Sequence, residues 1–111
     1  MSKKLIFVFV GVIFISGFHF AFAGLVINEI MYDLEGTDTG REWIEVYNNS
    51  ESSVDLSSYR FFEADTNHEL VVVAGDANIG AGGFAIIVSD YDKLKIDWPG
   101  FSGTIFYSSF Y

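Results

Sequence analysis

The sequence has 111 residues, which is enough for one compact domain, and 18% of them are aromatic, which supplies bulky side chains for a core. Its 15 acidic residues against 6 basic ones give a formal net charge of −9, which repels phosphate backbones and argues against direct nucleic-acid binding. Cysteine is absent, so disulfides and thiolate metal sites are excluded and stability must come from packing.

The first 23 residues have the pattern of a secretion signal. Lys3 and Lys4 precede an apolar run that begins at Leu5, and Ala21 and Ala23 place small residues two apart at its end. A signal peptidase recognises this order, so we predict cleavage after Ala23 and a protein that is secreted, periplasmic or at the cell surface. Removing the signal leaves four basic residues against 15 acidic ones, a formal charge of −11.

A retained transmembrane helix is the alternative for this segment, because the run approaches the roughly 20 apolar residues that span a bilayer. Two features favour cleavage instead. The run ends in small residues, and the charged residues that follow it, Glu29 and Asp33, are acidic rather than a basic stop-transfer cluster. Contact with a membrane is therefore expected only through this segment, if it stays uncleaved.

The remainder, residues 24–111, alternates apolar and polar residues with a period close to two, which is typical of half-buried strands. Turn-forming residues separate the strands, and a short helical turn is expected near Asp90 to Leu94, before a bend at Trp98-Pro99-Gly100. Several short strands divided by such turns predict an all-β sandwich or barrel. The expected strands are residues 25–32, 41–48, 54–61, 68–74 and 84–88.

Two early segments, Val26-Ile27-Asn28-Glu29-Ile30-Met31-Tyr32 and Gly40-Arg41-Glu42-Trp43-Ile44-Glu45-Val46-Tyr47-Asn48, resemble the opening of a lamin-tail domain of the bacterial secreted type. Residues 54–59, 82–88 and 99–103 resemble later segments of that family in the same order. The resemblance implies an immunoglobulin-like β-sandwich that contacts other macromolecules and carries no catalytic residues. Because the family pattern continues beyond Tyr111, the domain at 24–111 is expected to be C-terminally truncated.

The loop after the first strand holds three carboxylates, Asp33, Glu35 and Asp38, at short spacing. Such a loop can gather the hard oxygen ligands that Ca²⁺ prefers, although its glycine is misplaced for an EF-hand. We therefore keep a calcium site beside the simpler interpretation of a solvated acidic loop, and expect no other cofactor.

For the other residues whose side chains could act in catalysis, the sequence favours structural roles. Glu42 and Glu45 are three apart on one strand and point to opposite faces, so they cannot act as a glycosidase pair, and Glu29 is expected to be a partly buried structural acid. His68 lacks an obvious partner, and Ser102 lies outside a nucleophile-elbow motif. Five aromatic residues are candidates for stacking on sugar rings or, more commonly, for core packing: Trp43, Tyr47, Tyr59, Phe61 and Phe62.

These observations predict a non-catalytic, exported binding or structural module that mediates macromolecular or cell-surface interactions. Its expected partners are a protein or a cell-wall polysaccharide, and the sequence does not indicate an oligomeric state. The alternative is an accessory-domain fragment of a larger secreted enzyme, such as a nuclease or hydrolase, encoded beyond Tyr111.

Overall fold

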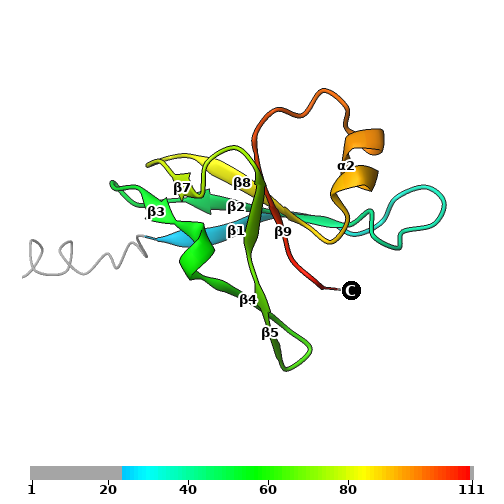
Figure 1. The fold of residues 1–111 in the computed structure, drawn as a ribbon, viewed down its shortest axis with the longest axis horizontal. Helices are drawn as coiled ribbons and strands as arrows, with labels where there is room; N and C mark the ends of the chain where they lie inside the picture. Colours follow the sequence, from blue (N-terminus) through cyan, green and yellow to red (C-terminus); the bar gives the residue numbers. More distant parts are fainter. Residues whose placement is uncertain (1–23, 111) are drawn as a thin grey trace, which may run out of the picture.

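The computed structural model describes residues 24–110, so the predicted signal segment lies outside the described part of the chain (Figure 1). Strands dominate the described part, with one short α-helix and one turn of 3₁₀-helix, as an immunoglobulin-like all-β fold requires. The elements in chain order are β1 (Leu25–Met31), β2 (Trp43–Asn48), β3 (Val54–Asp55), η1 (Leu56–Ser58), β4 (Arg60–Glu63), β5 (Thr66–Glu69), β6 (Val71–Ala74), β7 (Asn78–Ile79), β8 (Phe84–Val88), α2 (Tyr91–Asp97) and β9 (Thr104–Tyr107). None of the helices in residues 24–110 has the length and hydrophobicity needed to cross a membrane.

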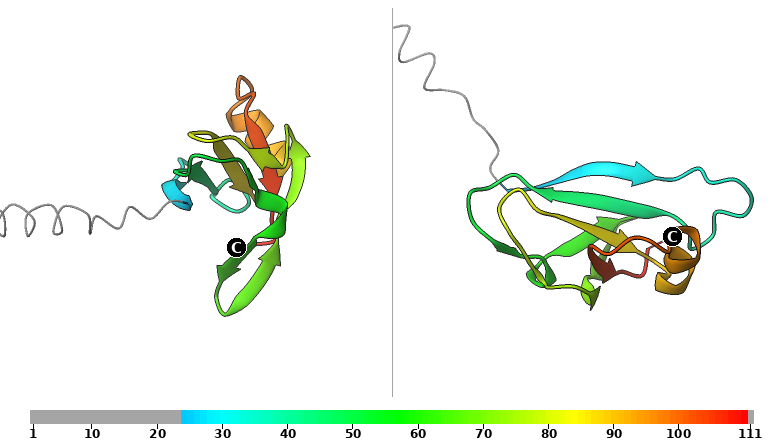
Figure 2. Two further views of the ribbon diagram at one scale, coloured as in Figure 1. Left: turned by 90° about the vertical axis from the view of Figure 1, so that its left-hand side faces the viewer. Right: turned by 90° about the horizontal axis from the view of Figure 1, so that it is seen from above.

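The main sheet has five strands in the order β1-β2-β8-β9-β6. Neighbouring strands are antiparallel except β8 and β9, which run parallel and are connected through α2, as parallel strands require a crossover. Two short ribbons, β3–β7 and β4–β5, form the second layer, and the β4–β5 hairpin projects away from the rest of the domain (Figure 2).

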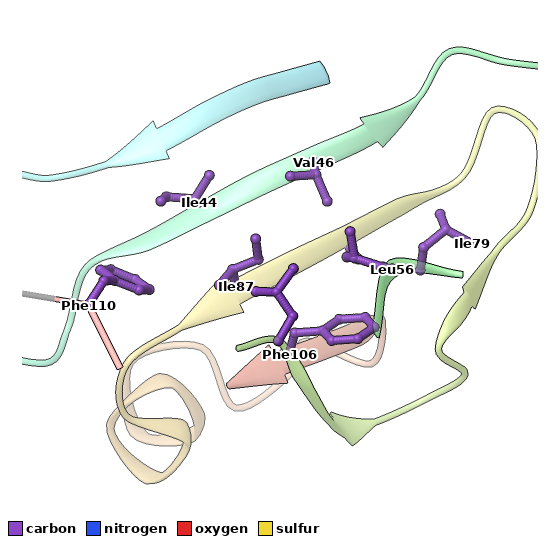
Figure 3. Close-up of a cluster of buried hydrophobic side chains, with 9 residues drawn as sticks. Ile44, Val46, Leu56, Ile79, Ile87, Phe106 and Phe110 are labelled. Atoms are coloured by element: carbon purple, nitrogen blue, oxygen red, sulfur yellow. The ribbon is translucent and has the colours of Figure 1, made fainter. Parts of the chain in front are cut away.

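One face of the main sheet, here called the inner face, packs against the second layer. It carries Ile44 and Val46 from β2, Ile87 from β8 and Phe106 from β9. The second layer and the C-terminal segment contribute the other large side chains of this core (Figure 3): Leu56, Leu70, Ile79 and Phe110. The alternation seen in the sequence of β2 is confirmed, because Ile44 and Val46 are buried while Glu45 between them is only half-buried.

The opposite face of the sheet, here called the outer face, is partly covered by α2. Leu94 of the helix packs on Ile86, Val88 and Ile105 to form a second, smaller core. Asp90 caps the helix by accepting a hydrogen bond from the Lys93 backbone N–H at 3.0 Å. The predicted helical turn near Asp90 is therefore confirmed, and it extends to Asp97.

Two of the predicted strands are each divided in the structure. The 54–61 segment is interrupted by η1, where Asp55 accepts a hydrogen bond from the Ser57 backbone N–H at 3.0 Å and so closes a turn. The 68–74 segment divides at the buried Leu70, because β5 pairs with β4 whereas β6 joins the main sheet. Period-two alternation indicates strand character but not the point at which a chain changes sheets.

Gly75 lies in the tight turn after β6, and its replacement by alanine is expected to be costly. Its φ is +79°, and a Cβ there would lie 2.5 Å from Thr104 Oγ1 and 3.0 Å from Thr104 Cα. We expect G75A to lower the free energy of unfolding by about 1–3 kcal/mol, measured by urea denaturation. The matched control is G100A, because no heavy atom lies within 4 Å of the added Cβ there. Equal stabilities of the two variants would contradict this account.

Candidate functional site

A groove of about 510 Å³ opens on the outer face of the main sheet, beside α2. Its floor is formed by outward-facing residues of β1, β2 and β8, and its wall by α2 and the bend that follows the helix. The lining is mostly apolar and aromatic, with three carboxylates: Glu29, Met31, Trp43, Glu45, Ile86, Leu94, Asp97, Trp98, Pro99, Gly100 and Phe101. A concave apolar surface with a few polar groups is the usual form of a ligand site.

The two tryptophans of the chain meet in this groove. The rings of Trp43 and Trp98 lie 6.3 Å apart, centroid to centroid, at an interplanar angle of 85°. Trp98 is 43% exposed although it is large and apolar, so part of its ring is available to a partner. Together with Phe101, the two indoles form what we call the aromatic corner of the groove.

A β-bulge in β1 brings two glutamates together at the same groove. Ile27 pairs with Val46, but after the bulge it is Glu29, not Asn28, that lies opposite Glu45. Directly opposed residues of antiparallel strands point to the same face, so both carboxylates lie on the outer face. The Asn28 amide donates to Glu45 Oε1 at 2.8 Å. We call Glu29 and Glu45 the glutamate pair.

The bulge corrects two expectations for β1. The period-two alternation predicted for residues 25–32 would put Ile27 and Glu29 on one face, whereas the inserted residue moves Glu29 to the outer face and Ile30 to the inner face opposite Ile44. Glu29 is also exposed, not partly buried as expected, because β1 is an edge strand and Leu94 of α2 packs on β8 and β9. A single inserted residue cannot be recognised from the apolar pattern of a short strand.

The third carboxylate of the groove, Asp97, is neutralised by Arg41. The guanidinium donates from Nε to Asp97 Oδ2 at 2.9 Å and from Nη2 to Oδ1 at 3.1 Å. The hydrogen bonds to Asp97 raise the pKa of Arg41 and outweigh the opposing effect of desolvation, and the Coulombic attractions of Asp97 and Asp38 raise it by smaller amounts. The bidentate pair joins the end of α2 to the loop before β2 and fixes the groove wall.

The aromatic residues singled out in the sequence do not share one face. Only Trp43 reaches the groove, whereas Tyr47 packs on Phe84 at 4.7 Å and Phe61 packs on Phe110 at 5.3 Å. Tyr59 and Phe62 are exposed elsewhere, near the β4–β5 hairpin. Sequence reasoning missed Trp98 and Phe101 as site residues, since the Trp98-Pro99-Gly100 bend was interpreted only as a turn. A tryptophan placed in an exposed bend directly after a helix was the available signal.

The loop carrying Asp33, Glu35 and Asp38 is organised by Arg41 and by its own backbone. Arg41 Nη1 donates to the carbonyls of Glu35 at 2.8 Å and Thr37 at 3.1 Å, and Asp38 Oδ1 accepts from the Leu34 N–H at 3.1 Å. Within residues 24–110, no group of three His, Asp or Glu side chains is placed to hold a metal ion. The calcium site stays a prediction, and it would require the loop to rearrange around the cation.

Calorimetric titration tests the calcium site directly. A loop with three carboxylates and no preformed cage would bind Ca²⁺ in the millimolar range and release heat, and D38N would abolish that heat. D76N, which alters an exposed acid in another turn, is the control and would leave the heat unchanged. No heat at millimolar Ca²⁺ would remove the calcium hypothesis.

His68 has partners that were not visible in the sequence. Its Nδ1 lies 3.1 Å from Ser109 Oγ, and its Nε2 lies 3.5 Å from Glu63 Oε2, outside hydrogen-bond geometry. The ring is buried and joins the β4–β5 hairpin to the C-terminal segment, which fits the structural role expected for it. Ser102 is exposed between α2 and β9, and neither it nor His68 lines the groove.

Comparison with known proteins adds one finding to this geometry. A family model described as Lamin Tail Domain matches residues 20–105, which include every residue of the groove and of the smaller core. No curated protein and no solved structure matches the chain. The residues whose pattern resembled that family, in β1, β2 and β8, are those that build the main sheet.

Proposed function

Since the chain belongs to the lamin tail domain family, whose members are non-catalytic immunoglobulin-like modules, we propose that it is an exported binding module. It contacts a macromolecule at the cell surface or in the secreted phase, and the groove beside α2 is its contact site. Fold alone does not specify function, so the proposal rests on the chemistry of this site.

The observation that carries the proposal is the exposed aromatic corner. Trp98 keeps 43% of its surface exposed, next to Trp43 and Phe101, in a groove rather than on a convex surface. Tryptophan is enriched where partners bind, since its large ring gives much contact area at a small entropic cost. A purely structural domain gains nothing from leaving this ring uncovered.

Export is supported by the sequence of residues 1–23. Lys3 and Lys4, the apolar run and the Ala21-Phe22-Ala23 ending together favour passage through a secretion machinery. Sequencing the N-terminus of the protein recovered from its host tests this part. A chain that starts at Gly24 would support export with cleavage, and a chain that starts at Met1 or Ser2 would contradict it.

Retention on purified surfaces tests the binding role. The purified protein is passed over immobilised peptidoglycan and over immobilised exported proteins of the host, with double-stranded DNA as a control matrix. We expect retention on one of the first two matrices, none on DNA because of the negative charge, and loss of retention in W98A. Absence of retention on both surfaces, or equal retention of W98A, would contradict the proposal.

A further inference from the structure

The glutamate pair has no counter-ion among the described residues. Glu29 and Glu45 face each other across β1 and β2, and like charges directly opposite each other destabilise a sheet. None of the arginine and lysine side chains of residues 24–110 is paired with either glutamate. Arg41 binds Asp97, Arg60 lies 3.7 Å from Glu69, and the amines of the two lysines donate to the carbonyls of Thr39 and Phe101.

The uncompensated charge lies beside the aromatic corner. Trp43 is the neighbour of Glu45 on the outer face of β2, and Trp98 and Phe101 form the opposite wall. An indole face attracts a cation through its quadrupole, and a carboxylate attracts it by charge and hydrogen bonding. Both kinds of group in one groove favour the same ligand, a cation carried on an apolar stem.

We propose that the groove binds the side chain of a lysine or arginine in a basic peptide segment of a partner protein. This inference rests on the proposed function and names its partner chemistry. The ammonium or guanidinium lies between the glutamate pair and the aromatic corner, and its methylene stem packs on Met31, Ile86 and Pro99.

A peptide fits this site better than a neutral sugar chain. Sugar hydroxyls bind carboxylates without neutralising them, whereas a cation removes the repulsion between Glu29 and Glu45. The strongly negative charge of the domain would also speed association with a basic partner.

Intrinsic fluorescence reports directly on this site, because the chain has two tryptophans and both line the groove. The probes are tetralysine and tetra-arginine, acetylated and amidated at their ends, with tetraglutamate and chitohexaose as comparison ligands. The dissociation constant is measured by fluorescence and by calorimetry, at low salt and at 0.5 M salt, because surface attraction is screened at the higher ionic strength. Circular dichroism verifies that each variant is folded.

Two double variants separate the site from general charge attraction. E29Q/E45Q and E51Q/E69Q remove the same number of charges, but Glu51 and Glu69 are exposed residues outside the groove. We expect E29Q/E45Q and W98A each to weaken binding of the basic peptides about tenfold, and E51Q/E69Q less than about threefold. The W98A effect should persist at 0.5 M salt.

Three results would overturn the inference. Equal weakening in the two double variants would show general charge attraction, and unchanged binding in W98A would show that the aromatic corner is not involved. Binding of chitohexaose in a W98A-sensitive manner, without binding of either basic peptide, would reject the basic partner while leaving the proposed function in place. Failure of the proposed function is recognised separately, by the absence of retention on both immobilised surfaces.

Discussion

Replacing Phe106 by alanine is expected to lower the free energy of unfolding by about 3–5 kcal/mol, the usual cost of removing a buried phenylalanine ring. Phe106 is 0% exposed and belongs to the inner core, the cluster on the inner face that also contains Ile87 of β8 and Leu56 of the second layer (Figure 3). A domain of this size is stabilised by only about 5–15 kcal/mol, so the loss would take a large share of it.

Urea denaturation followed by tryptophan fluorescence measures this loss. The matched control is F62A on β4, because Phe62 is 63% exposed and its removal is expected to change stability by about 0.5 kcal/mol or less. If F106A folds too poorly for a titration, F106L retains most of the volume and should show a smaller loss. Equal stabilities of F106A and F62A would contradict the position of the inner core.

Much of the fold could be predicted because one face of each strand is more buried than the other, and this difference produces an alternating apolar and polar pattern in the sequence. The alternation around Ile44 and Val46 and the continuous apolar run of β8 correspond to two of the three interior strands of the main sheet. Gly, Asn and Asp indicated the turns correctly, since their backbone preferences are local. Local signals of this kind do not depend on which strands become neighbours.

The candidate site depends on long-range features that have no local signal. The glutamate pair arises from a bulge at Asn28, and the parallel pairing of β8 and β9 is what places Trp98 and Phe101 over the outer face. The Arg41–Asp97 pair joins residues 56 positions apart. From the sequence, Trp43 was a candidate for stacking, and Glu29 and Glu45 were considered as possible catalytic or structural acids. The sequence did not predict that these three residues line one groove.

Replacing Asn48 by alanine is expected to cause the second large loss of stability, because Asn48 is a fully buried polar side chain that holds two turns together. Its amide Nδ2 donates to the carbonyls of Ser52 at 2.8 Å, Ile79 at 2.9 Å and Gly80 at 3.1 Å. Its Oδ1 accepts from the Ser50 N–H at 3.0 Å and from the Ser50 hydroxyl at 2.7 Å. Leaving several buried backbone groups without partners is expected to lower stability by about 2–4 kcal/mol in N48A.

An aspartate at this position separates loss of hydrogen bonding from loss of volume. N48D keeps the size of the side chain but replaces the donating amide by an acceptor that faces three carbonyl oxygens, so it should destabilise at pH 7 at least as much as N48A. Protonation restores one donor, so the loss relative to the wild type should be smaller at pH 4 than at pH 7. The controls are N67A and N67D, since Asn67 is exposed on β5 and should change stability by about 0.5 kcal/mol or less. A tolerated N48D at pH 7 would show that the amide does not donate to these carbonyls, and that the two turns are held together by their backbone contacts alone.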